Sequence, residues 1–488
     1  MNVDDNISVF FNTRKIFTHN LFLHIKTNRL IKNTVIYPEN FTAALHKQRR
    51  DCMPIQVVEG TTLSAAKKCK EAECTDRVAV LNFANPIEPG GGVLRGANAQ
   101  EEYLCRCSNL YFALAAPERM EDYYSKHSYT NDKMFSDRVI YSHDVCVIKD
   151  DEYKQLKNPF YVDVLTCAAP YIELNEKIND NYLVSVILGR VRNILEAAIE
   201  NKVDVLVLGA FGCGAFHNSP TMVAGAFYEA LISEKYCKYF KRVFFAIKPS
   251  KPERCPNVEA FRNVFSGAVK KYSVLGDSIS TYEGFNPEQN AVFYNSFNNF
   301  RNDLKSVEDT WWSQVIDDLG GELCVNNSYS GGMVSGNEFP AACSPERAGA
   351  LHTQNDAPDC ILIYIGFNDF GRGIPIKCKK SKNTFSFYSA YCTMLKIVKK
   401  QYPFSRIVAM TLPKGYIRDE ADRPFPEWFN GNISFSDYND AIRKACREYN
   451  VEIADIALSE KRYETLDGTH PTAEGHRLIA ENVLKHLG

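Results

Sequence analysis

Two adjacent glutamates, Glu101 and Glu102, follow a run of three glycines, Gly90–Gly92, within the segment NFANPIEPGGGVLRGANAQEEYLCRCSNLY that spans Asn82–Tyr111. Glycine takes positive φ readily, and its missing side chain lets backbone amides lie against a ligand, so a phosphate or a sugar fits beside this run. Carboxyl groups are the usual general acids and bases of glycoside hydrolysis. The stretch therefore indicates a site for a phosphate or a sugar.

The residues after the glutamates predict one helix that places both carboxyl groups in its first turn. Apolar side chains recur at intervals of three and four residues, at Leu104, Cys107, Leu110, Tyr111 and Leu114. Adjacent helical residues point about 100° apart, so the two glutamates cannot face each other across a scissile bond as in a conventional glycosidase. At most one of them aims at that bond, and the other is better placed to hold a hydroxyl or to cap the helix.

The same half of the chain contains a second glycine-rich turn, GAFGCGAFHN, at Gly209–Asn218. It leads into SPTMVAGAFYEAL, where Ser219 suits the N-cap of a helix and Pro220 suits its first position. The free amides and the dipole at a helix N-terminus favour an anion. This turn is therefore a second candidate for ligand binding.

The first half of the chain predicts a mainly parallel sheet covered by helices on both faces. Ligands bind beyond the C-terminal ends of strands in such sheets, which is where both glycine turns fall. Thr61 or Thr62 is expected to cap a helix that follows the strand Ile55–Val58. The other predicted strands are Val78–Phe83, Tyr161–Ala168, Val203–Leu208 and Val243–Ile247, with short strands at Leu21–Ile25 and Thr34–Tyr37, and the clearest helices are Val9–His19, Asn181–Asn201 and Val258–Val264.

The order GGG, seven residues, QEE resembles the microbial-type poly(ADP-ribose) glycohydrolases, which are macrodomains. The resemblance implies that the two glycine turns grip the ribose and the diphosphate of ADP-ribose, that Phe216 packs against a ribose and that Asn218 fixes the second turn. The implied ADP-ribose-binding residues are Asn85, Gly90, Gly91, Gly92, Gln100, Gly212, Cys213, Gly214, Phe216 and Asn218.

The leading hypothesis for this half is cleavage of the ribose–ribose O-glycosidic bond of poly(ADP-ribose). Protonated Glu102 would act as the acid toward the leaving hydroxyl, and its carboxylate would then activate water, while Glu101 would hold a ribose hydroxyl. A macrodomain that binds ADP-ribose without cleaving it, or one that hydrolyses mono(ADP-ribose) from protein, are the alternatives. No metal and no cofactor are expected, because no cluster of acidic or histidine ligands accompanies the glutamates.

A second set of reactive residues begins at Ser278 in KKYSVLGDSIST. A serine at a turn between a strand and a helix is exposed at the end of the strand and close to helical amides, which suits a nucleophile. Gly331 follows in NNSYSGG, Asn368 in GFND, and Asp467 and His470 in DGTHP.

These four blocks, in this order, resemble the SGNH or GDSL-like hydrolases. The resemblance implies a flavodoxin-like three-layer α/β/α domain in which His470 takes the proton of Ser278 and Asp467 orients the imidazole. The oxyanion would be held by the amides of Ser278 and Gly331 and by the side chain of Asn368. A small acyl ester is the expected substrate, and an acylated ADP-ribose, a sugar acetyl ester and a lipid ester all remain open.

Length and composition bound these hypotheses. The 488 residues suggest two or three domains. The motifs predict a macrodomain-type domain over 51–268 and an esterase-type domain over 272–488, with residues 1–50 as a helix and strand extension of the first. A net charge of −2 gives no case for broad nucleic-acid attraction. The sixteen cysteines are spread through expected strands and helices, which indicates mainly reduced thiols.

With no bilayer-length apolar stretch and no leader pattern, we expect a cytoplasmic protein that makes no membrane contact. Its expected partners are poly(ADP-ribose) or ADP-ribosylated protein and a small acyl ester.

Overall fold

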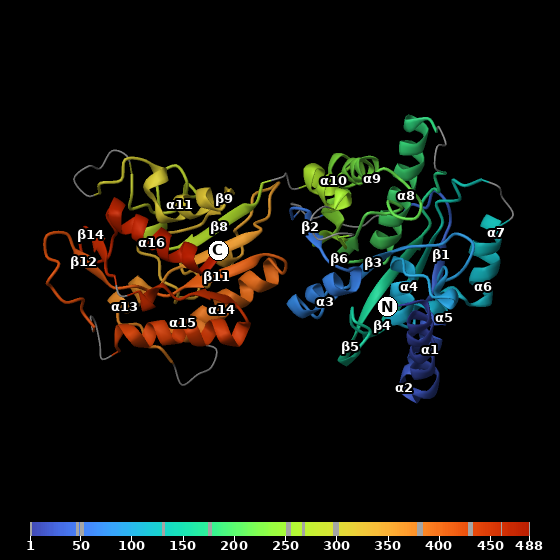
Figure 1. The fold of residues 1–488 in the computed structure, drawn as a ribbon, viewed down its shortest axis with the longest axis horizontal. Helices are drawn as coiled ribbons and strands as arrows, with labels where there is room; N and C mark the ends of the chain where they lie inside the picture. The colour runs from blue at the N-terminus through green and yellow to red at the C-terminus, as the bar shows by residue number, and fades with distance from the viewer. Residues whose placement is uncertain are drawn as a thin grey trace. The chain divides into compact units, whose positions relative to one another are not determined.

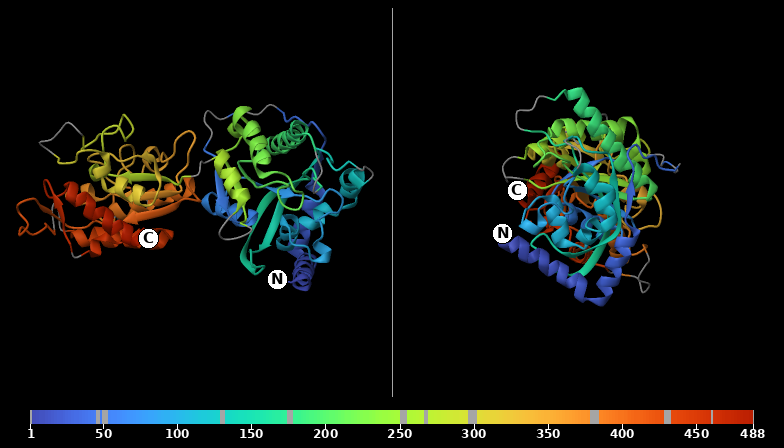
Figure 2. Two further views of the ribbon diagram at one scale, coloured as in Figure 1. Left: turned by 45° about the horizontal axis from the view of Figure 1, so that its top comes forward. Right: turned by 90° about the vertical axis from the view of Figure 1, so that its right-hand side faces the viewer.

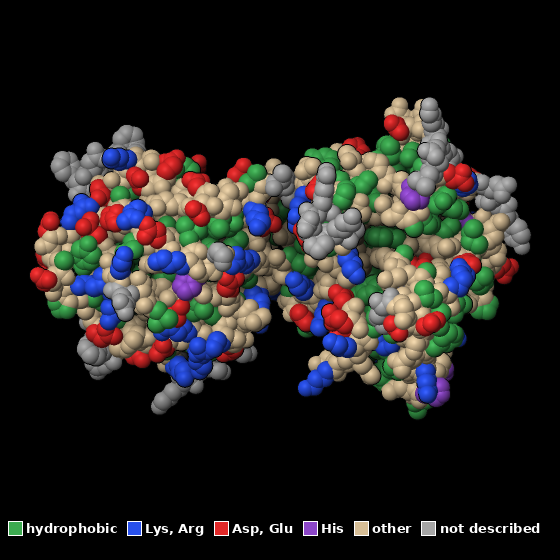
Figure 3. Space-filling model, in the orientation of Figure 1, with side chains coloured by type: hydrophobic (Ala, Val, Ile, Leu, Met, Phe, Trp, Pro, Cys, Tyr) green, Lys and Arg blue, Asp and Glu red, His purple; other side chains and the backbone are tan. Residues whose placement is uncertain are grey.

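The computed structural model divides the chain into two compact units, Met1–Ala268 and Val269–Gly488, and each is described here by itself (Figure 1). Side chains of both charge signs are interspersed over the face drawn in Figure 3. None of the described helices is long and apolar enough to cross a membrane. The structure describes residues 2–44, 48, 53–128, 132–173, 178–249, 255–265, 269–295, 302–377, 384–427, 433–459 and 461–487.

The N-terminal unit is built on a seven-stranded sheet with the order β1-β4-β5-β3-β6-β7-β2. Five neighbouring strands, from β5 to β2, pair in parallel, while β1 and β4 add antiparallel pairs at one edge. The mainly parallel α/β fold predicted from the sequence is confirmed, but β4 is a strand that the sequence reading missed. The strands are β1 (Val35–Tyr37), β2 (Gln56–Glu59), β3 (Val78–Phe83), β4 (Val139–Lys149), β5 (Gln155–Cys167), β6 (Val205–Leu208) and β7 (Arg242–Ile247).

Helices pack on this sheet because alternate residues of its central strands are buried on each face. Helices α8 and α9 pack against each other and share a large apolar cluster with β3, β5, β6 and β7, and α10 packs on α9. Helix α3 contacts β3 and β6 and begins at the predicted cap, where Thr61 Oγ1 accepts the N–H of Ser64. Figure 2 shows the helices around the sheet. These helices are α3 (Thr62–Ala72), α8 (Asp180–Glu200), α9 (Pro220–Tyr228) and α10 (Pro256–Phe265).

Two local predictions for the N-terminal unit are wrong. The run Leu21–Ile25, expected to be a strand, begins a helix, because Asn20 caps it by accepting the N–H of Leu23. The single helix expected from Gln100 onward is broken at Ser108, whose extended backbone forms an isolated bridge with Val147 of the missed strand β4. The helices and turns here are α1 (Val3–His19), α2 (Leu21–Asn33), η1 (Val93–Arg95), α4 (Gln100–Cys107), α5 (Leu110–Leu114), α6 (Pro117–Arg119), η2 (Met120–Tyr124), α7 (Ser125–Ser128), η3 (Glu229–Ser233) and η4 (Tyr236–Tyr239).

The C-terminal unit holds a five-stranded, fully parallel sheet with the order β13-β11-β10-β8-β9. Counted along the chain, this is the flavodoxin-like order 2-1-3-4-5, so the predicted fold class is confirmed. Helix α11 packs with α16 and α14 with α15, on opposite sides of the sheet (Figure 1). The strands are β8 (Lys271–Gly276), β9 (Glu322–Asn326), β10 (Cys360–Tyr364), β11 (Arg406–Met410) and β13 (Glu452–Ala454).

The remaining elements of this unit include a small parallel ribbon formed by β12 and β14, which leads directly into the DGTHP block. Ser278 begins a single 3-10 turn, η5, where a longer helix was expected. The elements are η5 (Ser278–Ser280), η6 (Val307–Asp309), α11 (Trp311–Asp318), α12 (Pro345–Ala348), α13 (Phe367–Gly371), α14 (Phe387–Gln401), β12 (Gly415–Ile417), α15 (Phe435–Tyr449), η7 (Ile456–Leu458), β14 (Tyr463–Thr465) and α16 (Ala473–Leu487).

Thirteen of the cysteines that the structure describes are free thiols, and most of these are buried. Cys237 is disulfide-bonded.

Candidate active sites

The side chain of Glu102 lies directly under the glycine loop. Its Oε1 accepts the N–H of Gly92 at 2.9 Å, and its Oε2 accepts the N–H of Ala99 at 2.8 Å. Gly91 has a φ of +57°, and a Cβ on it would overlap Glu102 Oε1 and approach Glu101 Oε2 within 3.2 Å. Only glycine combines that backbone conformation with that contact, so the loop and the carboxyl pair are built as one unit.

Glu101 is buried and held by a different set of donors. Its Oε2 accepts the N–H of Asn85 at 2.7 Å, and its Oε1 accepts Asn82 Nδ2 at 3.3 Å. Burial raises the pKa of Glu101 to about 8; the donors from Asn85 and Asn82 oppose this rise, and the nearby charge of Glu102 adds to it. Glu101 therefore keeps its proton at neutral pH.

Both glutamates line a pocket of about 770 Å³ at the C-terminal ends of the sheet strands. Of the predicted ADP-ribose-binding residues, Asn85, Gln100, Gly212, Gly214 and Phe216 are also in this lining. The pocket thus brings the two glutamates together with part of the second glycine turn, at the strand ends where a parallel sheet binds its ligands.

The polar side chains of Gln100 and Asn85 are engaged within the protein. Gln100 Oε1 accepts the N–H of Phe83 at 2.9 Å, and its Nε2 donates to the carbonyl of Leu81 at 2.7 Å. Asn85 Oδ1 accepts the N–H groups of Ile87 and Glu88. These two residues shape the wall of the pocket by fixing the backbone around β3.

The second glycine turn is held by Asn218 from behind. Asn218 Nδ2 donates to the carbonyls of Pro170 at 2.7 Å, Gly212 at 3.1 Å and Phe216 at 3.3 Å. A Cβ on Gly212, whose φ is +71°, would come within 2.6 Å of that same nitrogen. Asn218 is therefore a residue that orders the turn, and it is not part of the pocket lining.

Several predicted contacts lie outside the lining. Gly90, Gly91 and Gly92 stand behind the two glutamates, and the Sγ of Cys213 turns to the carbonyl of Phe211. Burial raises the pKa of Cys213 to about 12, so its thiol stays neutral.

In the C-terminal unit, Ser278, His470 and Asp467 form a connected chain. His470 Nε2 lies 2.8 Å from Ser278 Oγ, and His470 Nδ1 lies 2.7 Å from Asp467 Oδ2. Burial alone would raise the pKa of Asp467, but its hydrogen bond with His470 and the backbone N–H groups of His470 and Thr469 lower it to about 2. Asp467 is therefore ionised and holds the imidazole with its Nδ1–H toward the carboxylate.

The predicted oxyanion residues lie on two neighbouring loops. Asn368, in the first turn of α13, donates its Nδ2 to the carbonyl of Gly332 at 3.0 Å, next to Gly331 with its φ of +75°. Asp369 accepts the N–H groups of Val334 and Ser335 at 2.8 and 3.1 Å, so it fixes this loop. These contacts place Asn368 and Gly331 side by side.

Comparison with known proteins identifies the N-terminal half. The family model of the microbial-type PARG catalytic domain matches residues 14–150. The poly(ADP-ribose) glycohydrolase of Thermomonospora curvata is 31% identical over 54% of this chain and 100% of its own chain, with a TM-score of 0.49. The chain belongs to the microbial-type poly(ADP-ribose) glycohydrolases.

A second glycohydrolase of the family, from Deinococcus radiodurans in complex with ADP-ribose, is 32% identical over 49% of this chain and 96% of its own, with a TM-score of 0.43. The C-terminal half matches the model of GDSL-like lipases and acylhydrolases over residues 270–422. No curated protein matches the chain. Both halves of the chain thus belong to hydrolase families, and both predicted resemblances are confirmed.

Sequence reasoning missed several residues that line the pocket of the N-terminal unit. Asp151, at the tip of the β4–β5 hairpin, accepts Thr61 Oγ1 at 2.8 Å and the hydroxyl of Tyr103. Lys248 after β7 and Asn257 in α10 also line the pocket. These residues lie far apart in the chain and share no motif, so only the sheet topology brings them together.

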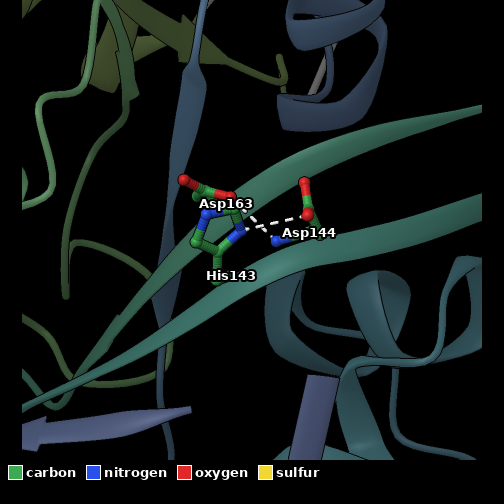
Figure 4. Close-up of side chains that lie close together, drawn as sticks. All are labelled: His143, Asp144 and Asp163. Atoms are coloured by element: carbon green, nitrogen blue, oxygen red, sulfur yellow. Dashed lines mark hydrogen bonds and ion pairs between the residues drawn. The ribbon is translucent and has the colours of Figure 1, made fainter. Parts of the chain in front are cut away.

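One group of potential metal ligands among the described residues lies outside this pocket, where His143 on β4 meets Asp144 and Asp163 (Figure 4). His143 Nδ1 is 3.3 Å from an oxygen of each aspartate, and Arg77 Nε is 3.7 Å from Asp163. The hydrogen bond to Asp144 raises the pKa of His143. The two carboxylates already have the Arg77 guanidinium and the His143 imidazole as partners, so this group forms a polar network within the sheet.

Proposed function

We propose that the N-terminal unit cleaves the ribose–ribose O-glycosidic bond of poly(ADP-ribose) and releases ADP-ribose. The observation that carries this proposal is the pair of glutamates that lines one pocket together with Gly212, Gly214 and Phe216 of the second glycine turn. The relative from Deinococcus radiodurans, a poly(ADP-ribose) glycohydrolase crystallised with ADP-ribose, supports the same ligand.

In this mechanism Glu102 gives a proton to the leaving ribose hydroxyl as the glycosidic C–O bond breaks. The oxocarbenium-like ribose is then attacked by water, which passes its proton to the Glu102 carboxylate and restores the acid. Neutral Glu101 donates a hydrogen bond to a ribose hydroxyl and keeps a second negative charge away from Glu102. The amides of the Gly212–Gly214 turn bind the diphosphate.

The raised pKa of Glu101 favours a second assignment, in which Glu101 itself is the acid. Glu101→Gln and Glu102→Gln separate the two, because each amide keeps the shape of the side chain and removes the transferable proton. Under our assignment, Glu102→Gln lowers ADP-ribose release from polymer by about 10²-fold or more, and Glu101→Gln lowers it less. The reverse order assigns the acid to Glu101.

The same assay decides between hydrolase and binding module. ADP-ribose binding, followed by calorimetry, is expected to survive in Glu102→Gln while release from polymer is lost. If wild-type protein binds ADP-ribose but releases none from polymer, the unit is a binding module. Release from singly modified protein, with polymer left intact, would instead identify a mono(ADP-ribosyl) hydrolase.

We further propose that the C-terminal unit hydrolyses a small acyl ester. Ser278 Oγ attacks the ester carbonyl while His470 Nε2 takes its proton, and the same proton passes to the leaving alcohol. Water, deprotonated by His470, then cleaves the acyl-serine bond, which releases the acid and restores the Ser278 hydroxyl. The amides of Ser278 and Gly331 and the side chain of Asn368 stabilise the tetrahedral oxyanion. The 2.8 Å contact between His470 and Ser278 is the observation that carries this proposal.

Turnover of p-nitrophenyl acetate by the full chain tests it. We expect Ser278→Ala to abolish turnover and Asp467→Asn to lower it by about 10³-fold or more, because the amide no longer supports the required imidazole tautomer. The polymer assay serves as a control for folding of the first unit. Equal ester turnover by wild type and Ser278→Ala would refute the assignment.

A further inference from the structure

An arginine beside the predicted oxyanion residues has no acidic partner among the described parts of the chain. Arg372, at the end of α13, is exposed, and its guanidinium meets only the carbonyl of Gly331 at 3.5 Å and the Sδ of Met333 at 3.6 Å. Both are weak contacts by distance or by acceptor type. Among the residues that the structure describes, no carboxylate forms an ion pair with it. Most of its donor capacity is therefore available.

Several other arginines of this unit form ion pairs with carboxylates. Arg406 pairs with Glu452, Arg443 with Asp455, and Arg477 with Glu474. Arg418 pairs with both Asp303 and Glu464. Arg372 and Arg447 form no such pair among the described residues, and of these two only Arg372 contacts Gly331.

The position of Arg372 relates it to the ester chemistry. It is the C-cap of α13, four residues after Asn368, and its N–H donates to the carbonyl of Asn368 at 3.1 Å, so the two residues lie about one helical turn apart on one face. Asn368 contacts Gly332, and Arg372 contacts the adjoining Gly331. The guanidinium therefore lies over the loop that is expected to hold the oxyanion.

We propose that Arg372 binds an anionic group, a carboxylate or a phosphate, that the ester substrate carries near its scissile bond. This inference rests on the proposed ester hydrolysis and names the substrate class for that site. A guanidinium fork matches the two oxygens of a carboxylate or phosphate. Its present contacts are weak, so the substrate replaces them at little cost.

Two matched pairs of esters test this with the full chain. In the first pair the acyl side differs: monoethyl succinate carries a carboxylate there and ethyl butyrate carries a neutral chain. In the second pair the alcohol side differs: O-acetyl-ribose 5-phosphate carries a phosphate there and O-acetyl-ribose does not. In wild type, kcat/KM is expected to be higher for the anionic member of at least one pair. In Arg372→Gln the anionic-to-neutral ratio falls about tenfold, and Arg372→Lys retains part of it.

Arg447→Gln is the matched control, since Arg447 is exposed in the last turn of α15 and carries the same charge. Its anionic-to-neutral ratio is expected to equal that of wild type. An equal fall in both variants would show an effect of net charge and overturn the proposal. An unchanged ratio in Arg372→Gln would overturn it as well.

A binding measurement keeps the inference separate from the chemistry. In Ser278→Ala, saturation-transfer NMR with monoethyl succinate and with O-acetyl-ribose 5-phosphate reports binding without turnover. Arg372→Gln in that background is expected to weaken binding of the anionic ester that wild type prefers by about tenfold. If wild type hydrolyses none of these esters but their binding still depends on Arg372, only the proposed reaction is refuted. Binding that does not depend on Arg372 would refute this inference.

Discussion

The phenyl ring of Phe293 lies flat on the imidazole of His470, with centroids 3.6 Å apart and planes inclined by 5°. The N–H of Phe293 donates to Thr281 Oγ1 at 2.9 Å, and the hydroxyl of the next residue, Tyr294, donates to the carbonyl of Pro471 at 2.9 Å. Both anchors connect to the segments that carry Ser278 and His470. The stack therefore fixes the plane of the imidazole, while Asp467 fixes its rotation.

Phe293→Leu is expected to lower kcat for ester hydrolysis about tenfold with little change in KM, because the freed imidazole spends less time aimed at Ser278. Phe293→Tyr keeps an aromatic face and should restore most of the rate. Steady-state kinetics with p-nitrophenyl acetate measures both. Phe285→Leu changes an exposed ring in the same segment and serves as control. Equal rates in the Leu and Tyr variants would show that the stack does not position His470.

Gly91 provides a test of the coupling between the glycine loop and the carboxyl pair. In Gly91→Ala the new methyl group meets Glu102 Oε1 at a backbone φ of +57°, so either the loop or the carboxylate must move. We expect ADP-ribose release from polymer to fall about 10²-fold while ester turnover by the same protein stays at the wild-type level.

Gly225→Ala is the control for Gly91→Ala, because nothing lies within 4 Å of a Cβ at that helical position. It is expected to leave both reactions unchanged. Polymer hydrolysis by Gly91→Ala at the wild-type rate would mean that the loop tolerates a displacement of Glu102.

The sequence predicted the parts of the fold that rest on local periodicity. Buried runs such as Val78–Phe83 became strands at the predicted places, since a strand covered on both faces reads as continuous apolar sequence. Strand β4 was not predicted, because His143 and Asp144 interrupt its apolar pattern at a shift of register. The apolar run Leu21–Ile25 was predicted to be a strand, but Leu21, Phe22 and Ile25 are exposed on a helix.

The candidate sites divide in the same way. Glu101, Glu102, Ser278 and His470 stand in motifs whose residue types follow from their chemistry, so sequence alone could single them out. Asp151 and Arg372 belong to no motif. Asp151 lies on the hairpin that the sequence did not predict, and Arg372 lies one helical turn after Asn368. Only their contacts in the structure identify them.

The buried Glu101 carboxyl makes the stability of the first unit depend on pH. Its pKa rises from 4.5 to about 8 on folding, so the folded state keeps a proton that the unfolded state loses above 4.5. The free energy of unfolding is therefore expected to decrease as pH rises from about 4.5 to about 8, and to level off above that.

Glu101→Gln removes this dependence, since the amide does not titrate. Thermal unfolding at pH 5, 6, 7 and 8 should show the Tm of the wild-type first unit falling by about 10 °C relative to that of Glu101→Gln across the series, because about 1.4 kcal/mol is lost per pH unit and each kcal/mol lowers the Tm of a unit of this size by about 2–4 °C. Parallel Tm profiles for the two proteins would show that Glu101 ionises in the folded state as it does in water.

Arg347 is a position where substitution is expected to destabilise the second unit strongly. Its buried guanidinium donates to the carbonyls of Gly276 at 2.7 Å, Asn327 at 2.9 Å and Pro340 at 2.6 Å, and so ties the end of β8 to the segments after β9. Burial lowers its pKa to about 10, opposed by the charge of Asp277, so it remains charged at neutral pH. Arg347→Met leaves three carbonyls without this donor.

Unsatisfied buried polar groups cost about 1–3 kcal/mol each, so we expect Arg347→Met to destabilise the second unit by about 3 kcal/mol or more. Urea unfolding followed by loss of ester turnover should shift to lower concentration, while polymer hydrolysis by the first unit keeps its wild-type midpoint. Arg477→Met removes an exposed arginine paired with Glu474 and should cost under about 1 kcal/mol. A similar shift in both variants would mean that the three carbonyls find other donors, and that the segments after β9 do not depend on this side chain for their position.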